Sequence, residues 1–289
     1  YSIGEVERLS PEAPVPILLV KKEKHVLGGA ANVANNISYL GGQVTLLGLT
    51  ANDQTKKRLE KELMINDIDY EFFDFLPMTI CKIRFLADEH HLLRVDREEK
   101  IKLTKEQEHI ILKKITDNIK NYNAIIISDY SKGIISEGVA KSIIELAINS
   151  NIPVLVDPKP QNMIFFKNAT IITPNAKEAH SFAPVHMTDT DMAGKYICNE
   201  LNTVLFMTRS EKGISIYEKG KEPIRVATKA KEVFDVTGAG DTTISTITLS
   251  ICAGLDYESA AAVANHAASV VIAKVGTATC SYDELKKDI

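Results

Sequence analysis

The chain alternates between short, almost wholly apolar runs and longer segments in which apolar residues recur at helical spacing. The short runs are rich in β-branched residues, a pattern typical of strands buried on both faces of a sheet. They lie at 43–49, 124–128, 153–157, 169–173, 203–208 and 214–218. The helical pattern covers 30–40, 54–66, 104–120, 136–150, 176–183, 189–201, 239–253 and 256–274. Strands separated by helices predict a mainly parallel sheet with helices on both faces.

Two segments depart from this pattern. Residues 14–26 and 79–97 alternate apolar and polar positions, which predicts strands exposed on one face. We expect them to form a small antiparallel sheet that projects from the main domain as a lid; irregular surface hairpins are the alternative. The predicted core is then 27–78 and 98–289, and the predicted β-lid is 1–26 and 79–97. Because exposed strand edges can pair with a second copy, a homodimer formed through the lid is expected.

Composition narrows the class of protein. The formal net charge of -4 supplies no global basic field for nucleic acid, so an anionic substrate would need a local basic pocket. The four cysteines are widely spaced without a CxxC pair, which argues against a disulfide framework or a zinc site. No apolar run reaches the roughly 18 residues that span a bilayer, and no signal-peptide pattern is present. A cytoplasmic protein without membrane contact is expected.

The string DVTGAGD at 235–241 is the strongest chemical signal. A β-rich segment ending at Val233 and Phe234 leads into it, and a helical pattern follows it. At such a strand-to-helix junction, small residues let backbone N–H groups approach an anion, and the helix N-terminus favours phosphate. The small residues are Gly238, Ala239 and Gly240. The string is neither a Walker loop nor a dinucleotide-binding GxGxxG.

Asp241 closes this string. A carboxylate beside a phosphate site is repelled by the phosphate unless it has a task there. One such task is to accept the proton of an attacking hydroxyl, because phosphoryl transfer needs a group that orients the nucleophile. The alternative interpretation is that Asp241 only caps the helix.

DVTGAGD resembles the C-terminal signature of the ribokinase family, also called the phosphofructokinase-B family. GGAANVANNISYLGG at 28–42 resembles the N-terminal signature of that family. The resemblance implies a three-layer α/β sandwich with a mainly parallel sheet and a β-lid, and an ATP-dependent carbohydrate kinase. It implies that Asp241 is the catalytic base and that the amides of 238–240 form the anion hole for the γ-phosphate. It also implies Mg²⁺, with a monovalent cation as a further candidate.

Several residues are candidates for sugar contact. Gly28 and Gly29 precede a predicted helix, and Asn32 presents an amide donor and acceptor to sugar hydroxyls. A tight turn with a helix cap is the alternative for these three. Lys82 and Arg84 fall on one face of a predicted lid strand, where they would suit a sugar phosphate. A solvated polar face is the alternative for this pair.

Other residues are candidates for nucleotide contact. Asn175 and Glu178 open a predicted helix, and Glu178 could hold Mg²⁺ through water, although the spacing equally fits a capping box. The family resemblance assigns this region to ATP and the metal, and extends the nucleotide site to two later regions. The residues concerned are Asn175, Ala176, Lys177, Glu178, Thr208, Gly213 and Asn265. No role follows for Arg209, and a buried structural histidine is the alternative for His266.

Further strings resemble the bacterial heptose 7-phosphate kinase branch of the family. They are SPEAPVPILLV, SDYSKG, VDPK, TPNAKE, TRSEKG and GTATCS, which begin at residues 10, 128, 156, 173, 208 and 276. The branch implies phosphorylation of the 1-hydroxyl of D-glycero-D-manno-heptose 7-phosphate in ADP-heptose and lipopolysaccharide core biosynthesis. Another sugar or sugar-phosphate kinase, or a non-catalytic sensor of sugar or nucleotide, is the alternative. Without an HxGH motif, no adenylyltransferase activity is expected from these residues.

Overall fold

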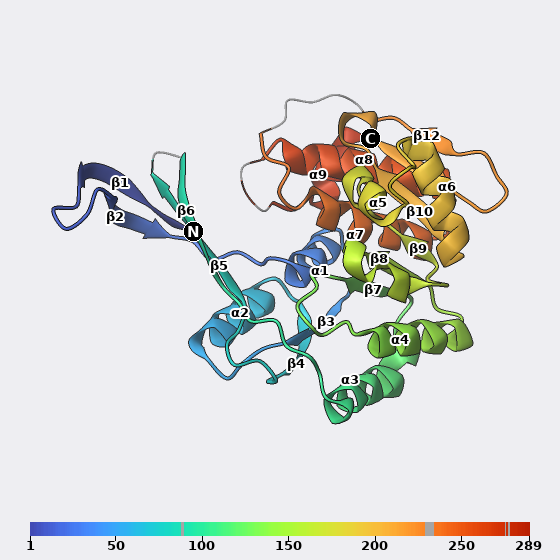
Figure 1. Cartoon of the computed structure of the whole chain (residues 1–289), viewed down its shortest axis with the longest axis horizontal. Coiled ribbons are helices and arrows are strands. Elements are labelled where there is room, and N and C mark those ends of the chain that lie inside the picture. The colour runs from blue at the N-terminus through green and yellow to red at the C-terminus, as the bar shows by residue number, and fades with distance from the viewer. Residues whose placement is uncertain (88–89, 229–233, 275, 277) are drawn as a thin grey trace.

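The structure is a computed structural model that describes residues 1–87, 90–228, 234–274, 276 and 278–289. Figure 1 shows a body of strands and helices from which a narrow sheet projects to one side. The main sheet has the strand order β12-β11-β10-β9-β8-β7. Strands β7 to β10 pair in parallel, β11 joins β10 antiparallel, and β12 joins β11 antiparallel. From β7 to β12 the bounds are Ile125–Ser128, Val154–Asp157, Ile171–Ile172, Val204–Thr208, Ile214–Tyr217 and Ile224–Val226.

Alternate residues of the central strands enter two different hydrophobic cores. In β8, Val154 and Val156 pack into one core, whereas Leu155 between them packs into the other. In β9, Ile172 belongs to the first core and Ile171 to the second. This two-residue period follows from the pleat of a strand, and it explains why strands that are apolar throughout are buried on both faces.

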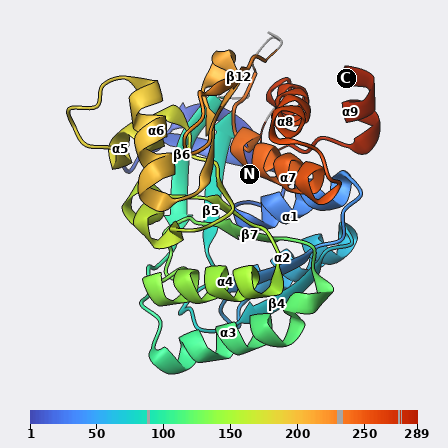
Figure 2. The same cartoon turned by 90° about the vertical axis from the view of Figure 1, so that its right-hand side faces the viewer.

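Helices close both cores. The first core contains residues from α3 (Lys105–Asn118), α4 (Glu137–Ser150), α5 (Ala176–Phe182) and α6 (Thr190–Leu201). The second contains residues from α1 (Ala30–Tyr39), α7 (Ala239–Cys252) and α8 (Tyr257–Ile272). Figure 2 shows α5 and α6 on one side of the strands and α7 and α8 on the other. The predicted three-layer α/β sandwich is therefore confirmed.

The projecting sheet has the strand order β2-β1-β5-β6. β1 pairs antiparallel with β2 and parallel with β5, and β5 pairs antiparallel with β6. These strands are Ser2–Leu9, Pro16–Glu23, Cys81–Ala87 and His90–Arg97 for β1, β2, β5 and β6. Residues 14–26 and 79–97 thus supply strands of one sheet, as expected, but the sheet is mixed and not wholly antiparallel, because β1 joins the two hairpins by pairing in parallel with β5. The division of the chain into a core and a lid domain stays a prediction.

A cleft separates the main sheet from a smaller one. β3 (Thr45–Leu49) and β4 (Asp69–Phe73) pair in parallel, and α2 (Gln54–Ile65) packs on them. Residues of β3 and β7 line a cleft of about 2000 Å³ that reaches the projecting sheet and contains Asp241. The Tyr122 hydroxyl donates to Thr45 Oγ1 at 2.9 Å, which ties the beginning of β3 to the segment before β7. The small sheet, the projecting sheet and α7 therefore surround one space.

The remaining elements are short. They are α9 (Tyr282–Asp288), η1 (Ile119–Asn121), η2 (Pro160–Phe166) and η3 (Ser210–Lys212). The predicted helices and strands of the body all form, with ends that shift by a few residues. The β-rich segment expected to end at Val233 and Phe234 lies mostly outside the described residues, and Phe234 itself is in a bend. None of the described helices is long and apolar enough to cross a bilayer.

Candidate active site

Helices α1 and α7 begin side by side at the cleft. Each is preceded by a glycine with positive φ, Gly29 at 58° and Gly238 at 86°. Among the described residues, neither helix has a side-chain cap, so no side chain competes with an anion for the first amides, although Ala239 N donates to the Val236 carbonyl at 3.2 Å. A Cβ added to Gly28 or Gly240 would meet nothing within 4 Å, so both glycines face open space. The predicted glycines therefore adjoin one open site.

Asp241 lies in the first turn of α7 and is 8% exposed. Asn32 Nδ2 donates to its Oδ2 at 2.7 Å, and the Tyr130 hydroxyl donates to its Oδ1 at 2.9 Å. Burial raises the pKa of Asp241 above its ordinary value, and the hydrogen bonds from Asn32 and Tyr130 oppose that rise. Both oxygens thus face side chains from other segments, an arrangement that differs from the helix-cap interpretation.

Polar contacts between α1 and α7 fix the position of this carboxylate. Thr242 Oγ1 donates to Asn36 Oδ1 at 2.8 Å, and Ser245 Oγ donates to the Val33 carbonyl at 3.0 Å. These bonds are buried, where a lost partner leaves an unsatisfied polar group. Asn32 is 1% exposed, and within the described residues its Oδ1 is buried without a hydrogen-bond partner. The structure thus gives Asn32 a contact with Asp241, and its contact with sugar stays a prediction.

Acidic side chains gather at the ends of β7 and β8, beside the first turn of α7. Asp129 accepts hydrogen bonds from Ser131 N at 2.7 Å and Asn162 Nδ2 at 2.9 Å. Burial raises the pKa of Asp157 to about 7, because Lys159 offsets only part of the cost of burying its charge. This region therefore favours a bound cation or a shared proton over a further negative charge.

Lys159 is the cation of this region. Its Nζ lies 2.8 Å from Glu178 Oε1 and 5.8 Å from the centroid of the Tyr130 ring. Burial works against its charge, but the hydrogen bond to Glu178 and the nearby carboxylates raise the pKa of Lys159 above its ordinary value. Lys159 therefore stays protonated and connects the Tyr130 ring to Glu178.

Asn175 and Glu178 form the capping box of α5. Asn175 Oδ1 accepts from Glu178 N at 2.9 Å, and Glu178 Oε2 accepts from Asn175 N at 3.0 Å. Thr208, at the end of β10, forms a parallel bridge with Asn175. Ala176 and Lys177 follow in the first turn of α5, the former partly buried against the first core and the latter exposed. The capping-box interpretation is confirmed, and the nucleotide role of this turn stays a prediction.

The acidic groups fit Mg²⁺ held largely by water and substrate oxygens. Within the described part of the chain, no three His, Cys, Asp or Glu side chains converge closely enough to hold a metal ion by themselves. Mg²⁺ commonly keeps several waters and binds through one or two carboxylates plus substrate phosphates. Glu178 and Asp157 supply carboxylates of that kind, and Glu178 is the residue predicted to act through water.

Gly213 and Arg209 have structural roles in the turn between β10 and β11. Gly213 has φ 76°, and a Cβ there would lie 2.2 Å from the Val226 carbonyl oxygen, so a side chain cannot fit. Arg209 Nη1 donates to Ser215 Oγ at 3.1 Å and lies 3.6 Å from Asp191 Oδ1. Arg209, to which the sequence assigns no role, therefore holds the hairpin to α6.

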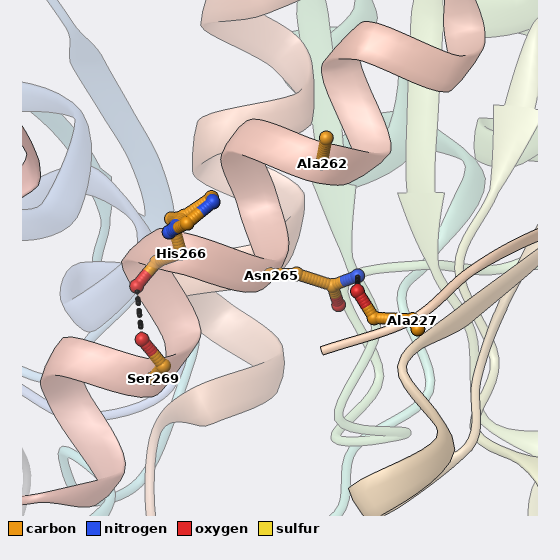
Figure 3. Close-up of a pocket in the computed structure, with 5 residues that line it drawn as sticks. All are labelled: Ala227, Ala262, Asn265, His266 and Ser269. Carbon is orange, nitrogen blue, oxygen red and sulfur yellow. Dashed lines mark hydrogen bonds between the residues drawn. The ribbon is translucent and has the colours of Figure 1, made fainter. Parts of the chain in front are cut away.

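Asn265 lies on α8 in a small pocket (Figure 3) of about 70 Å³. Its Nδ2 donates to the Val226 carbonyl at 2.9 Å, which anchors the segment after β12. Its neighbour His266 is bonded through Nδ1 to Asp288 Oδ2 at 2.9 Å, so His266 ties α8 to α9. The pocket is lined by Ala227, Ala262, Asn265, His266 and Ser269. The structural interpretation of His266 agrees with these contacts.

The predicted basic residues of the projecting sheet line the same cleft as Asp241. Lys82 already pairs with two carboxylates, Asp96 Oδ2 at 2.8 Å and Glu98 Oε2 at 2.9 Å. Glu98 Oε1 also accepts from Lys132 Nζ at 2.6 Å, so Glu98 bridges the projecting sheet and the loop after β7. The Arg84 guanidinium lies 5.6 Å from the centroid of the Tyr1 ring. An anion at this end of the cleft would share these cations with Asp96 and Glu98.

Sequence reasoning overlooked four side chains of the site. Tyr130 and Lys132 belong to SDYSKG, and Asp157 and Lys159 belong to VDPK. Both strings stand out as resemblances, but neither contains a spacing that points to a particular chemistry. Their roles emerge only when β7 and β8 end beside α7.

Comparison with known proteins identifies the family. The sequence profile of the pfkB family carbohydrate kinases matches residues 1–284. The chain belongs to this family. The resemblance to the ribokinase-type kinases is thereby confirmed.

Relatives of this pfkB kinase extend the comparison. The bifunctional protein HldE of Histophilus somni is 40% identical over 294 residues, which cover 100% of this chain and 61% of the relative. The bifunctional protein HldE of Campylobacter curvus is 36% identical over 295 residues, covering 99% of this chain and 62% of the relative. The pfkB kinase chain thus spans about three fifths of the length of these relatives.

Solved structures share the fold at low sequence identity. Phosphofructokinase-2 from Escherichia coli in complex with potassium superposes with a TM-score of 0.78 at 18% identity, over 99% of this chain and 93% of that one. Arabidopsis thaliana ribokinase complexed with ribose and ATP gives a TM-score of 0.74 at 16% identity, over 100% of this chain and 94% of that one. These similarities establish the fold of this pfkB kinase.

Proposed function

We propose that this chain transfers the γ-phosphate of ATP to the 1-hydroxyl of D-glycero-D-manno-heptose 7-phosphate, as a step of ADP-heptose and lipopolysaccharide core biosynthesis in the cytoplasm. The observation that carries the proposal is the Asp241 carboxylate, held at the N-terminus of α7 in a cleft that also contains Lys82 and Arg84. The similarity to HldE proteins along the whole chain and the heptose-branch strings support this choice of sugar.

The geometry suits a direct transfer between the two substrates. The sugar hydroxyl gives its proton to Asp241 while its oxygen forms a bond to the γ-phosphorus. The bond between that phosphorus and the bridging oxygen of ADP breaks, so the products are ADP and the sugar phosphate. The amides of Gly238, Ala239 and Gly240 would stabilise the γ-phosphate charge, since α7 begins there without a side-chain cap among the described residues; Ala239 N would exchange its 3.2 Å bond to the Val236 carbonyl for the phosphate.

The carboxylates of Asp157 and Glu178 would hold Mg²⁺ through water, with Lys159 fixing the position of Glu178. When bound, Mg²⁺ neutralises phosphate charge during transfer. A nucleotide role for Asn175 to Glu178, Thr208, Gly213 and Asn265 belongs to the same proposal. The proposal also includes a monovalent cation that supports turnover. Comparing turnover in potassium and sodium buffers tests this.

The distal phosphate of the sugar would lie near Lys82, Arg84 and Lys132. These cations line the cleft that contains Asp241. The Glu98 carboxylate already lies between Lys82 and Lys132 at 2.9 and 2.6 Å. A phosphate dianion could compete for these ammonium groups because it carries more charge than one carboxylate. An unphosphorylated sugar would leave them paired with Glu98 and gain nothing from them.

The assay is turnover of the purified chain with ATP and a panel of heptose 7-phosphate, unphosphorylated heptose, fructose 6-phosphate and ribose. We expect the highest kcat/KM for heptose 7-phosphate, with a 1,7-bisphosphate product identified by ³¹P NMR. Faster turnover of another sugar would replace the heptose assignment with that sugar. Binding without any turnover would instead favour the sensor. The Asp241→Asn variant in parallel controls for contaminating kinases.

The projecting sheet is also proposed to act as a lid that excludes water and joins two copies. Large apolar side chains are exposed on its strands and turns, namely Val6, Leu9, Val15, Leu19, Val20, Leu92, Leu93 and Val95. Exposed apolar patches of this kind commonly mark interaction surfaces. Sedimentation should show a dimer that Leu19→Glu with Leu93→Glu converts to a monomer, whereas Val185→Glu, in a position 98% exposed outside this sheet, should not. A monomeric parent chain refutes the lid dimer.

A further inference from the structure

Tyr130 contacts the reacting carboxylate, although no kinase signature in the sequence assigns it a role. Its hydroxyl donates to Asp241 Oδ1 at 2.9 Å, while Asn32 donates to Oδ2 at 2.7 Å. A carboxylate with one donor can still rotate about its Cβ–Cγ bond. With a donor on each oxygen from a different segment of the chain, its plane is fixed. Each oxygen keeps a second lone pair, so the carboxylate can still accept the proton of a substrate hydroxyl.

The position of Tyr130 is itself determined by two other segments and by its own loop. A Cβ on Gly29 would come within 3.5 Å of ring atom Cε2, so the ring packs against the glycine turn before α1. Lys159 Nζ lies 5.8 Å from the ring centroid, on the β8 side. The loop that carries Tyr130 is fixed by Asp129, which accepts from Ser131 N at 2.7 Å. The hydroxyl is therefore held by packing and not only by its bond to Asp241.

We propose that Tyr130 is a positioning residue for the catalytic base, which orients the Asp241 carboxylate and favours its ionised form. The inference rests on the proposed function, in which Asp241 accepts the proton of the sugar hydroxyl. Tyr130 acts through Asp241, because a hydrogen bond to a carboxylate stabilises the ionised state that can receive a proton.

The electrostatic surroundings agree with a neutral, permanent donor. Burial and the Asp241 charge raise the pKa of Tyr130 well above its ordinary value, so the phenol keeps its proton and is not itself the base. Asp241 also faces Lys159, whose charge lowers its pKa. Asp157 lies close enough to interact electrostatically with Asp241, and Asp157 in turn interacts with Asp129 and Glu178. Loss of the phenol donor would raise the pKa of Asp241 and so favour its protonated form.

The test is Tyr130→Phe, with Tyr122→Phe as the matched control. Both changes remove a tyrosine hydroxyl that donates one hydrogen bond at 2.9 Å, but Tyr122 donates to Thr45, at the beginning of β3. Tyr130 is 37% exposed and Phe keeps its ring packing, so the variant should fold with a thermal midpoint near that of the parent. We expect kcat to fall about tenfold, as loss of a hydrogen bond to a charged group implies, with ATP affinity unchanged.

The pH profile distinguishes positioning from a merely structural role. Because Asp241 must be ionised to act, a raised pKa moves the acidic limb of kcat/KM to higher pH in Tyr130→Phe. The limb should stay in place in Tyr122→Phe. A Tyr130→Phe enzyme with parental kcat and an unmoved acidic limb overturns the proposal.

A double-mutant comparison separates this proposal from the proposed function. If Tyr130 acts through Asp241, the loss caused by Tyr130→Phe should disappear in an Asp241→Asn background. Equal losses in both backgrounds refute positioning through Asp241. If Asp241→Asn alone turns over normally, the proposed function fails. If Asp241→Asn is inactive while Tyr130→Phe is unaffected, only the role of Tyr130 fails.

Discussion

Asp241→Asn is the most informative perturbation of this site. The side chain keeps its size, but it can no longer accept a proton from the sugar hydroxyl. General-base catalysis typically contributes about 10²–10⁴-fold, so we expect kcat to fall at least about a hundredfold. That loss corresponds to roughly 3 kcal/mol or more of transition-state stabilisation, at about 1.36 kcal/mol for each factor of ten.

The fold should tolerate this change well. The new amide can still accept the Tyr130 hydroxyl through its oxygen. Its nitrogen would conflict with the donating Asn32 Nδ2, but Asn32 Oδ1 is buried without a partner among the described residues and can accept after an amide flip. The change also removes a buried charge, since burial raises the pKa of Asp241. The thermal midpoint near pH 7.5 should therefore be equal or higher.

Three measurements on one variant decide the matter. These are kcat with the best sugar substrate, ATP affinity by calorimetry, and the thermal midpoint. ATP affinity should be nearly unchanged, because the amides of Gly238 to Gly240 remain. A helix-capping role predicts normal kcat, since Asn caps a helix about as well as Asp. A stable variant with near-parental turnover would therefore refute the base assignment and the mechanism built on it.

Three further predictions address other parts of the molecule. Lys82→Ala or Arg84→Ala should raise KM for the phosphorylated sugar and leave KM for ATP nearly fixed in steady-state kinetics. If neither KM changes, both residues belong to a solvated surface and do not bind the sugar phosphate. Burial raises the pKa of Asp157 to about 7, so the parent should lose stability between about pH 4 and 7, where that carboxyl is ionised in the unfolded chain but still protonated in the folded state. The Asp157→Asn variant should lack this loss. If the thermal midpoints of parent and variant change in the same way from pH 5 to 8, the prediction is wrong. Gly213→Ala should destabilise the fold by more than about 1 kcal/mol, because its Cβ would lie 2.2 Å from the Val226 carbonyl oxygen; denaturant unfolding measures this, and an unchanged midpoint would refute it.

Hydrophobic periodicity predicts the body of the fold well, because burial on both faces leaves strong patterns. Val154 to Val156 form an apolar run, which is typical of a strand buried on both faces, and β8 forms there. β1 was missed because most of its residues after Gly4 are exposed, so its sequence carries no core signal. β12 is too short, at 3 residues, to show a period.

The residues of the candidate site likewise fall into those that the sequence predicts and those that only the structure reveals. Asp241 and the glycines before it lie within one contiguous string, so their chemistry is visible in the sequence. Tyr130 meets Asp241 across 111 residues, and a single tyrosine in a loop carries no period or spacing. The pairing of Lys82 with Asp96 depends on the register between β5 and β6, which sequence alternation leaves open. Contacts between residues far apart in the sequence therefore depend on the tertiary structure, and local sequence patterns do not predict them.

The bonds between α1 and α7 also have a consequence for the timing of activity during synthesis. Asn32 and Asp241 are 209 residues apart, and Ser245 contacts the Val33 carbonyl across 212 residues. Contacts this distant in sequence form late and slow folding, because a long stretch of chain must be ordered before they are made. On the ribosome, the face of α1 that meets α7 stays uncovered until α7 has emerged. A nascent chain therefore has no catalytic site until about five sixths of these residues have been made, and its early exposed helix is a surface that chaperones would be expected to bind.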